Sequence, residues 1–167
     1  MDTSDVIVVM GVSGSGKTSV GRAIAAETSW DFIEGEAFFE PADREAYRAG
    51  TLDDAGMDNW LKVVGSWIDG YESTGRDAVL CCPALRRRDR DALRKGRPHV
   101  RFCHVTANRA TLRNRVGAEG AQHLKDDVSA LEPLGADEHG VTVSTEGDPY
   151  DIARKALASL GLDPGHS

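Results

Sequence analysis

The sequence predicts an α/β fold, in which helices cover both faces of a parallel β-sheet. Short apolar runs alternate along the chain with longer segments whose apolar residues recur at helical spacing. Strands that are apolar throughout are typical of a parallel sheet buried on both faces, and parallel strands need crossover connections, usually helices. Because the chain has 167 residues and no internal repeat or long linker, we expect one domain, residues 1–167.

The expected strands follow one another as five short apolar runs. They are Val6–Met10, Trp30–Ile33, Ala78–Cys82, Val100–Val105 and Val141–Val143. Each run has three to six residues, which is ordinary for a strand and short for a helix.

The expected helices lie between and after these runs. One begins near Gly16, and the others are Asp58–Tyr71, Asp89–Lys95, Ala107–Val116 and Pro149–Leu160. In Asp58–Tyr71 the apolar side chains recur three or four residues apart, and in Pro149–Leu160 they form a single stripe. The tail from Asp163 to Ser167 contains Pro and Gly, so we expect it to be frayed.

Composition narrows the class of protein. The formal net charge is −7, whereas nucleic-acid-binding proteins usually carry a basic excess, so we expect no nucleic-acid partner. The apolar run near the N-terminus has five residues, too few for a membrane span or a signal sequence, so we expect no membrane partner and a cytoplasmic location. Cys81, Cys82 and Cys103 are odd in number and lack paired metal-ligand spacing, so we expect buried free thiols.

The stretch "GVSGSGKT", Gly11 to Thr18, follows the first strand and fits the phosphate-binding pattern G-x-x-x-x-G-K-S/T. Glycines let a phosphate approach the main-chain N–H groups, and the start of the following helix adds its own N–H groups. Lys17 would reach the β- and γ-phosphates of a nucleoside triphosphate, and the Thr18 hydroxyl would bind Mg²⁺. The expected nucleotide-binding residues are Gly11, Val12, Ser13, Gly14, Ser15, Gly16, Lys17, Thr18 and Ser19.

The phosphate-binding loop alone does not name the reaction. No N-K-x-D guanine-recognition motif is present, and Asp53–Gly56 fits the D-x-x-G pattern but follows no expected strand. A single domain of this length is typical of a small-molecule kinase.

Two carboxylates support that interpretation. Glu34 and Glu36 stand two residues apart at the end of the second strand, and alternate residues of a strand point the same way. At the carboxyl edge of a parallel sheet, Glu34 could hold a Mg²⁺-bound water and Glu36 could accept a proton from a substrate hydroxyl. A solvated acidic turn is the alternative.

Five blocks of sequence then occur in a recognisable order. They are "MGVSGSGKT", "EGE" with Glu40-Pro41, "LDDAGMDNWL", "CPALRRRDRDALRKG" and "LEPLGADE". They resemble "MGVSGSGKS", "DGD" with His-Pro, "PLNDDDRxPWL", "CSALKxxYRDxLRxG" and "LxEPxxDE" of the gluconate kinases, small kinases related to shikimate kinase in fold. The resemblance extends along nearly the whole chain.

The resemblance implies the P-loop kinase fold, a five-stranded parallel sheet in the order 2-3-1-4-5 with helices on both faces and a short lid at about residues 115–131. It implies transfer of the γ-phosphoryl group of ATP to the terminal hydroxyl of D-gluconate, giving 6-phosphogluconate, with Mg²⁺ and often in a homodimer. It also implies that adenine lies against the segment Thr145–Pro149.

The chain departs from the family pattern where the acceptor would bind. Met57 replaces an arginine that is expected to grip the substrate carboxylate. The lid lacks the family's "R-x-G-H-F-F" and "L-V-x-S-Q" patterns and is shorter. Glutamates replace both aspartates of "DGD", and the extra methylene displaces each reactive oxygen by about an ångström. The acceptor half of the resemblance is therefore altered, whereas the nucleotide half is intact.

The remaining cations are divided between site and surface. Arg115 matches the first lid arginine and is the expected transition-state cation, and Arg86 matches the lysine of "CSALK" and is the expected anchor for a carboxylate. We expect Arg109, Arg113 and His123 to be solvated. We also expect the rest of the run "RRRDRD" to form a solvated helix face, with Asp91 paired to Lys95.

These residues define an expected mechanism. Lys17, Glu36 and Arg115 would be catalytic, Glu34, Glu36 and Arg86 would bind the substrate, and Thr18 would be the metal ligand. Two alternatives stay open at this point: a phosphotransferase for a different sugar acid or hydroxylated small molecule, and a nucleotide-binding protein without turnover.

Overall fold

Five parallel strands form the centre of the structure, a computed structural model that describes residues 4–162. They are β1 (Val6–Met10), β2 (Asp31–Glu34), β3 (Ala78–Cys81), β4 (Val100–Thr106) and β5 (Gly140–Ser144). Their order across the sheet is β2-β3-β1-β4-β5, and every neighbouring pair is parallel. The predicted strands, fold class and strand order are therefore confirmed.

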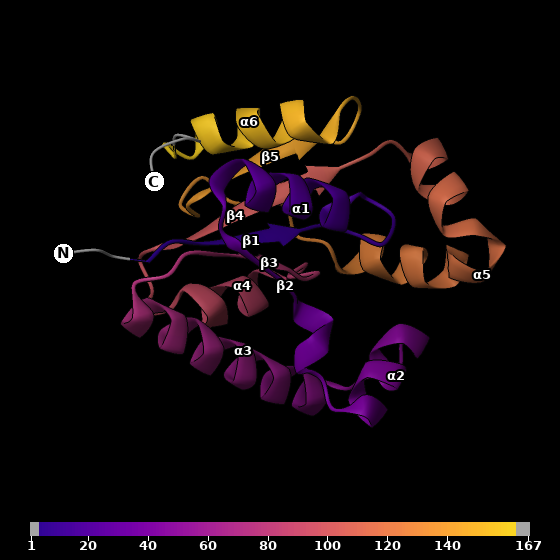
Figure 1. Cartoon of the computed structure of the whole chain (residues 1–167). Helices are drawn as coiled ribbons and strands as arrows, with labels where there is room; N and C mark the ends of the chain where they lie inside the picture. The colour runs from indigo at the N-terminus through magenta and orange to yellow at the C-terminus, as the bar shows by residue number, and fades with distance from the viewer. Residues whose placement is uncertain (1–3, 163–167) are drawn as a thin grey trace.

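Helices cover both faces of this sheet (Figure 1). One face carries α1 (Lys17–Thr28) and α6 (Pro149–Ser159), and the other carries α3 (Asp54–Thr74) and α4 (Arg87–Arg94). Two further helices, α2 (Pro41–Ala49) and α5 (Arg109–Ala130), lie beyond the carboxyl ends of the strands (Figure 1). The carboxyl edge of the sheet therefore faces a space bordered by α2 and α5.

The central strand explains why its sequence is apolar throughout. All five residues of β1 are fully buried. Ile7 and Val9 pack in the core under α1 and α6, whereas Val6, Val8 and Met10 pack in the core under α3 and α4. Because successive side chains of a strand point to opposite faces, a strand buried on both faces has no position for a polar residue.

Three helical features differ from the expected ones. The helix expected to begin at Asp58 begins four residues earlier, because the side chain of Asp53 caps it by accepting a hydrogen bond of 2.8 Å from the N–H of Gly56. This cap is the structural role of the D-x-x-G match. The helix α2 and a short 3₁₀ turn, η1 (Gly35–Phe38), were not expected.

The third difference concerns α5. The helix expected to end at Val116 continues through a kink at Gly117, where φ is 67° and ψ is −175°, to Ala130. We call residues 109–116 the first arm of α5 and residues 118–130 its second arm. The segment 115–131, expected as a lid, therefore consists mainly of the second arm.

One buried ion pair corrects the interpretation of "RRRDRD". Arg90 is completely buried, and its Nε donates a 2.8 Å hydrogen bond to Glu138, whose side chain is also completely buried. The same guanidinium donates to the carbonyl oxygens of Ala84 and Leu85. The expected solvated helix face is thus wrong for this residue, because Arg90 connects α4 to the loop that follows α5. The expected Asp91–Lys95 pair is also replaced, since Asp91 pairs with Arg87 and Arg94 instead.

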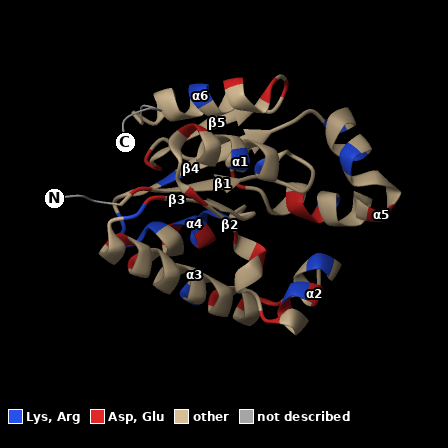
Figure 2. Cartoon of the chain, viewed as in Figure 1, with Lys and Arg blue, Asp and Glu red and all other residues tan. Residues whose placement is uncertain are grey.

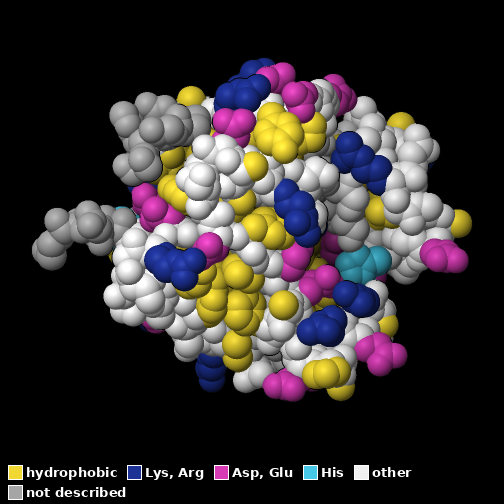
Figure 3. Space-filling model, in the orientation of Figure 1, with side chains coloured by type: hydrophobic (Ala, Val, Ile, Leu, Met, Phe, Trp, Pro, Cys, Tyr) yellow, Lys and Arg dark blue, Asp and Glu magenta, His cyan; other side chains and the backbone are white. Residues whose placement is uncertain are grey.

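The structure can also be compared with the predictions made from composition. Cys81, Cys82 and Cys103 are free and buried, as expected. Among residues 4–162, no helix combines the length and the apolar character that crossing a bilayer requires. Charged residues of both signs are spread over the helices (Figure 2), and they are interspersed on the face seen in Figure 3. The segment Asp163–Ser167, expected to be frayed, lies outside the described residues.

We expect the Arg90–Glu138 pair to be a major contributor to stability. Glu138→Gln should lower the free energy of unfolding by about 3 kcal/mol or more, because it leaves the Arg90 charge buried without a counter-ion. Urea unfolding at pH 7 measures this change. The matched control is Glu27→Gln, which breaks a pair with Arg154 at the surface and should cost at most about 1 kcal/mol. Equal losses in the two variants would contradict the prediction.

Candidate active site

The loop Gly11–Thr18 connects β1 to α1, and its conformation requires glycine. Gly11 has φ 157°, and a Cβ there would lie 2.6 Å from the Ser15 hydroxyl oxygen and 2.7 Å from the carbonyl oxygen of Val105. Gly16 has φ 101° and is the N-cap of α1. The hydroxyl of Ser15 is buried and has no hydrogen-bond partner within residues 4–162. A concave loop with close backbone packing at the N-terminus of a helix fits a bound phosphate.

The ammonium group of Lys17 lies over this loop. Its Nζ donates to the carbonyl oxygens of Gly11 at 2.8 Å and Val12 at 3.1 Å. Burial lowers the pKa of Lys17, and the nearby carboxylate of Asp127 partly opposes that shift. A poorly hydrated cation with only carbonyl partners has a strong tendency to bind an anion such as a phosphate.

Thr18 lies beside Glu34 at the start of α1. The Thr18 hydroxyl donates a 2.7 Å hydrogen bond to a carboxylate oxygen of Glu34, the last residue of β2. A hydroxyl and a carboxylate next to a phosphate site are oxygen ligands of the kind that Mg²⁺ binds, directly or through water. The two residues therefore fit a magnesium ion shared with a nucleotide.

Glu36 reaches the same place by a different route from the expected one. It lies in η1 and not on a strand, so the argument from alternating strand residues is wrong for it. Nonetheless Glu34 and Glu36 both line a hollow of about 430 Å³ together with Lys17 and Thr18. The side chain of Glu36 is 3.5 Å from Nε of Arg48, and its carbonyl oxygen accepts from Arg44, so α2 holds it in position.

Arg115 lies on the other side of the phosphate-binding loop. Its guanidinium donates to the carbonyl oxygen of Gly14 at 2.9 Å and to the hydroxyl of Thr145 at 3.4 Å. A second hollow of about 280 Å³ lies here, and it includes Thr145, Gly147 and Pro149 in its lining. This is the segment that the resemblance associated with adenine. Arg109 and Arg113, on the same arm of α5, are exposed as expected.

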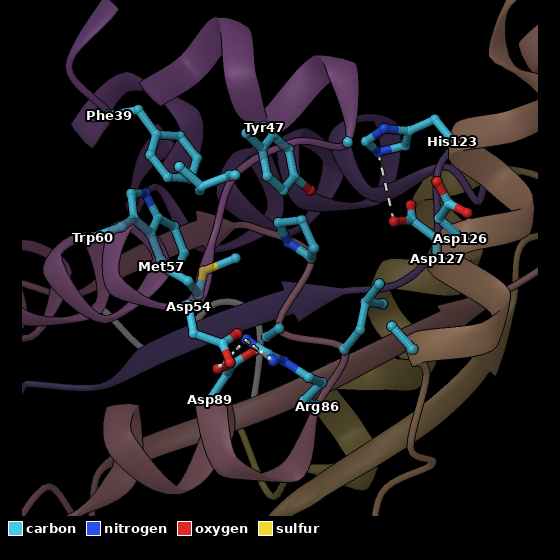
Figure 4. A pocket seen from close by; sticks show the side chains of 16 residues that line it. Phe39, Tyr47, Asp54, Met57, Trp60, Arg86, Asp89, His123, Asp126 and Asp127 are labelled. Atoms are coloured by element: carbon cyan, nitrogen blue, oxygen red, sulfur yellow. Dashed lines mark hydrogen bonds and ion pairs between the residues drawn. The ribbon is translucent and has the colours of Figure 1, made fainter. Parts of the chain in front are cut away.

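A third hollow, of about 270 Å³, adjoins the phosphate site (Figure 4). The rings of Phe39, Tyr47 and Trp60 form one wall, with Phe39 stacked 5.2 Å from each of the other two. The second arm of α5 forms the opposite wall. The third hollow shares Tyr47, Pro83 and His123 with the hollow that contains Lys17 and Glu36, so an acceptor bound here would reach the phosphate site.

Arg86 lies in this third hollow and is already paired. Its Nη1 donates to Asp54 at 3.0 Å, and its Nε donates to Asp89 at 3.1 Å. The hydrogen bond from Arg86 lowers the pKa of Asp54, so both groups are charged at neutral pH. The structure thus places Arg86 apart from Glu34 and Glu36, in the neighbouring hollow.

Two residues of the site were not found by the sequence reasoning. The carboxylate of Asp127 accepts hydrogen bonds from the main-chain N–H of Ser13 at 2.9 Å and from its hydroxyl at 2.7 Å. His123, expected to be solvated, is half-buried and lies 3.5 Å from Asp127 and edge-on to the ring of Tyr47. No local pattern marks either residue, because the contacts of Asp127 with Ser13 and of His123 with Tyr47 join the second arm of α5 to distant segments.

The unexpected helix α2 did have a local signal. Pro41 occupies its first turn, and Gly50 ends it with φ 74°. Proline at the start and glycine just past the end are typical of a helix. These two residues could have predicted the helix that holds Glu36.

Comparisons with known proteins agree with this geometry. No protein-family model matches the chain. A gluconokinase of Gluconobacter oxydans is 37% identical over 157 residues, which cover 90% of this chain and 88% of that protein. Among solved structures, a sugar kinase from Janibacter has a TM-score of 0.88 at 33% identity and covers 96% of both chains. A gluconokinase from Sinorhizobium meliloti has a TM-score of 0.79 at 31% identity and covers 96% of this chain and 94% of that one.

The loop geometry leads to a binding prediction. Lys17→Met should raise the Kd for Mg²⁺·ATP by at least about tenfold, because a hydrogen bond to a charged group contributes about 1.5–3 kcal/mol. Isothermal titration calorimetry measures the change. Lys155→Met is the matched control, since Lys155 is exposed on α6 and lines none of the three hollows. An unchanged Kd for Lys17→Met would show that the loop does not bind the nucleotide through this ammonium group.

Proposed function

The chain belongs to the gluconokinase family, and from that premise we propose that it transfers the γ-phosphoryl group of ATP to D-gluconate, giving 6-phosphogluconate and ADP. The observation that carries the proposal is the adjacency of two hollows. One contains the phosphate-binding loop, Lys17 and Glu36, and the other is open to a small molecule between the aromatic wall and α5. Their shared residues bring an acceptor hydroxyl against the terminal phosphate.

In this proposal each substrate has its own hollow. The triphosphate lies on Gly11–Thr18 and the adenine lies against Thr145–Pro149. The acceptor lies beside Trp60, whose indole N–H is bonded to the carbonyl oxygen of Gly35 at 2.9 Å and so fixes the ring. Thr18 and Glu34 would hold a magnesium ion, which when bound neutralises charge on the phosphates.

The reaction requires one bond to form and one to break. The terminal hydroxyl oxygen of the acceptor attacks the γ-phosphorus, the bond between that phosphorus and the β,γ-bridging oxygen breaks, and ADP leaves. Glu36 orients the hydroxyl and accepts its proton as the new bond forms. Lys17 and Arg115 offset the negative charge that spreads over the transferred group.

The second arm of α5 has a supporting role in the proposal. Asp127 fastens this arm to Ser13 in the phosphate-binding loop. The arm then covers the phosphate site and the third hollow, which is lined by Phe39, Tyr47 and Trp60 and which we call the acceptor hollow. A covered site excludes water that would otherwise hydrolyse ATP. We propose a cytoplasmic enzyme, because ATP and an environment that keeps thiols reduced are both found there. The homodimer implied by the resemblance stays a prediction.

The first test is the reaction itself, followed through ADP release and through 6-phosphogluconate formed from D-gluconate. Glu36→Gln should lower kcat by at least about a hundredfold and leave the KM for ATP nearly unchanged, because it removes the proton acceptor and not the phosphate contacts. Glu45→Gln is the control, since Glu45 is an exposed residue of α2. Absence of 6-phosphogluconate in the wild-type reaction would refute gluconate as the acceptor.

A second test concerns Arg115. Arg115→Ala should lower kcat by at least about a hundredfold, because an arginine at the transferred phosphoryl group stabilises the transition state far more than the bound substrate. Steady-state kinetics separates kcat from the KM for ATP. Arg113→Ala, two residues earlier on the same arm, should leave both constants within about twofold. Arg113 lines neither the hollow that contains Lys17 nor the hollow that contains Thr145. Similar losses in the two variants would assign the effect to the stability of α5.

A further inference from the structure

The acceptor hollow has an unexpected balance of charge. Among the residues that line it, Arg86 is the one Arg or Lys, whereas Asp54, Asp89, Asp126 and Asp127 supply four carboxylates. A gluconate ion entering this space would bring a fifth carboxylate. Like charges at close range repel, and water screens that repulsion less at the buried Asp89 and Asp127 than at the exposed Asp54 and Asp126.

The charge of this one guanidinium is already balanced by two aspartates. Arg86 donates to Asp89 through Nε at 3.1 Å and through Nη2 at 3.4 Å, and to Asp54 through Nη1 at 3.0 Å. Three of its five N–H groups therefore donate to these aspartates, whose negative charges already balance the charge of the guanidinium. Figure 4 shows this group of three side chains along one side of the hollow, below Met57.

Two departures from the family pattern both make the acceptor hollow more negative. Met57 stands where the pattern "DDDR" has its arginine, so one cation is absent. Asp89 stands where the pattern "CSALKxxYRD" has its tyrosine, and Asp89 is one of the two carboxylates that occupy Arg86. Met57 and Asp89 both line the acceptor hollow. The two changes together remove one positive charge from it and add one negative charge.

The same lining suits an uncharged polyol. Carboxylates accept hydrogen bonds from hydroxyl groups, and Asp54 and Asp126 are both exposed and line the hollow. The aromatic wall of Phe39, Tyr47 and Trp60 offers a flat apolar surface for the C–H groups of a sugar chain. A polyol makes these contacts without bringing a further negative charge.

We propose that the acceptor hollow also takes neutral polyols, and that the enzyme phosphorylates an uncharged six-carbon polyol about as efficiently as gluconate or better. The inference rests on the proposed phosphoryl transfer and changes only the acceptor. The phosphoryl transfer follows the same steps as with gluconate: a terminal hydroxyl oxygen bonds to the γ-phosphorus, the bond to the bridging oxygen breaks, Glu36 takes the proton and ADP leaves.

The test compares D-gluconate with D-glucitol, which has a CH₂OH group in place of the carboxylate. ADP release is measured with each acceptor, and the product is identified by mass spectrometry. For the wild-type enzyme we expect the ratio of kcat/KM for gluconate to kcat/KM for glucitol to be at most about two. A ratio above that value overturns the inference.

Two variants test whether the charge of the acceptor hollow decides between gluconate and glucitol. Met57→Arg restores the absent cation, and Asp89→Asn releases Arg86 from one carboxylate with a side chain of the same shape. Each should raise the gluconate-to-glucitol ratio by at least about fivefold, mainly by lowering the KM for gluconate. Asp69→Asn is the matched control, because Asp69 pairs with Arg97 and neither residue lines the hollow, and it should leave the ratio unchanged. If neither Met57→Arg nor Asp89→Asn moves the ratio, the charge argument is refuted.

Using two acceptors also separates this inference from the proposed function. Phosphorylation of glucitol without phosphorylation of gluconate would refute gluconate as the acceptor and support the inference. Phosphorylation of gluconate alone would do the opposite. If neither acceptor leads to ADP release, both the proposed function and the inference are refuted. Partial loss of folded protein in a variant does not change the ratio, because both acceptors are measured on the same preparation.

Discussion

The structure depends on the close contact between the phosphate-binding loop and the sheet beneath it. Gly11 lies so near the carbonyl oxygen of Val105 that no side chain fits there. This contact keeps the loop at the end of the central strand β1, where the first turn of α1 begins. Lys17 lies over the loop, where its ammonium group donates to the carbonyl oxygens of Gly11 and Val12.

The acceptor side is held to that loop by contacts between distant segments. The carboxylate of Asp127 accepts hydrogen bonds from the main-chain N–H and the hydroxyl of Ser13, and so joins the second arm of α5 to the nucleotide site. Arg90 and Glu138 hold the loop after α5 against α4, inside the protein. Glu36 is fixed by two arginines of α2. The geometry of phosphoryl transfer therefore depends on polar contacts that join elements far apart in the sequence, and not on the sheet alone.

Shape and charge in the acceptor hollow convey different information. The stacked rings of Phe39 with Tyr47 and Trp60 form an apolar wall of this hollow. The charges are less usual, since Arg86 is held by Asp54 and Asp89. The phosphate-binding loop keeps the family pattern, whereas Met57 and Asp89 in the acceptor hollow depart from it.

The sequence by itself determined the fold class and the phosphate-binding loop, because these depend on local spacing: apolar runs for buried strands and glycines ahead of a lysine for a loop. The strand order came from the resemblance to a known family. The sequence also singled out Glu34 and Arg115, which the structure places against Thr18 and Gly14 of that loop. It could not determine that Glu36 enters the site from a 3₁₀ turn, that Asp127 binds Ser13, or that Asp89 occupies Arg86. The first depends on where the strand ends, and the other two depend on side-chain contacts across the fold. Only the tertiary structure decides them, since it is the packing of α3, α4 and α5 around one sheet edge that brings these charges together.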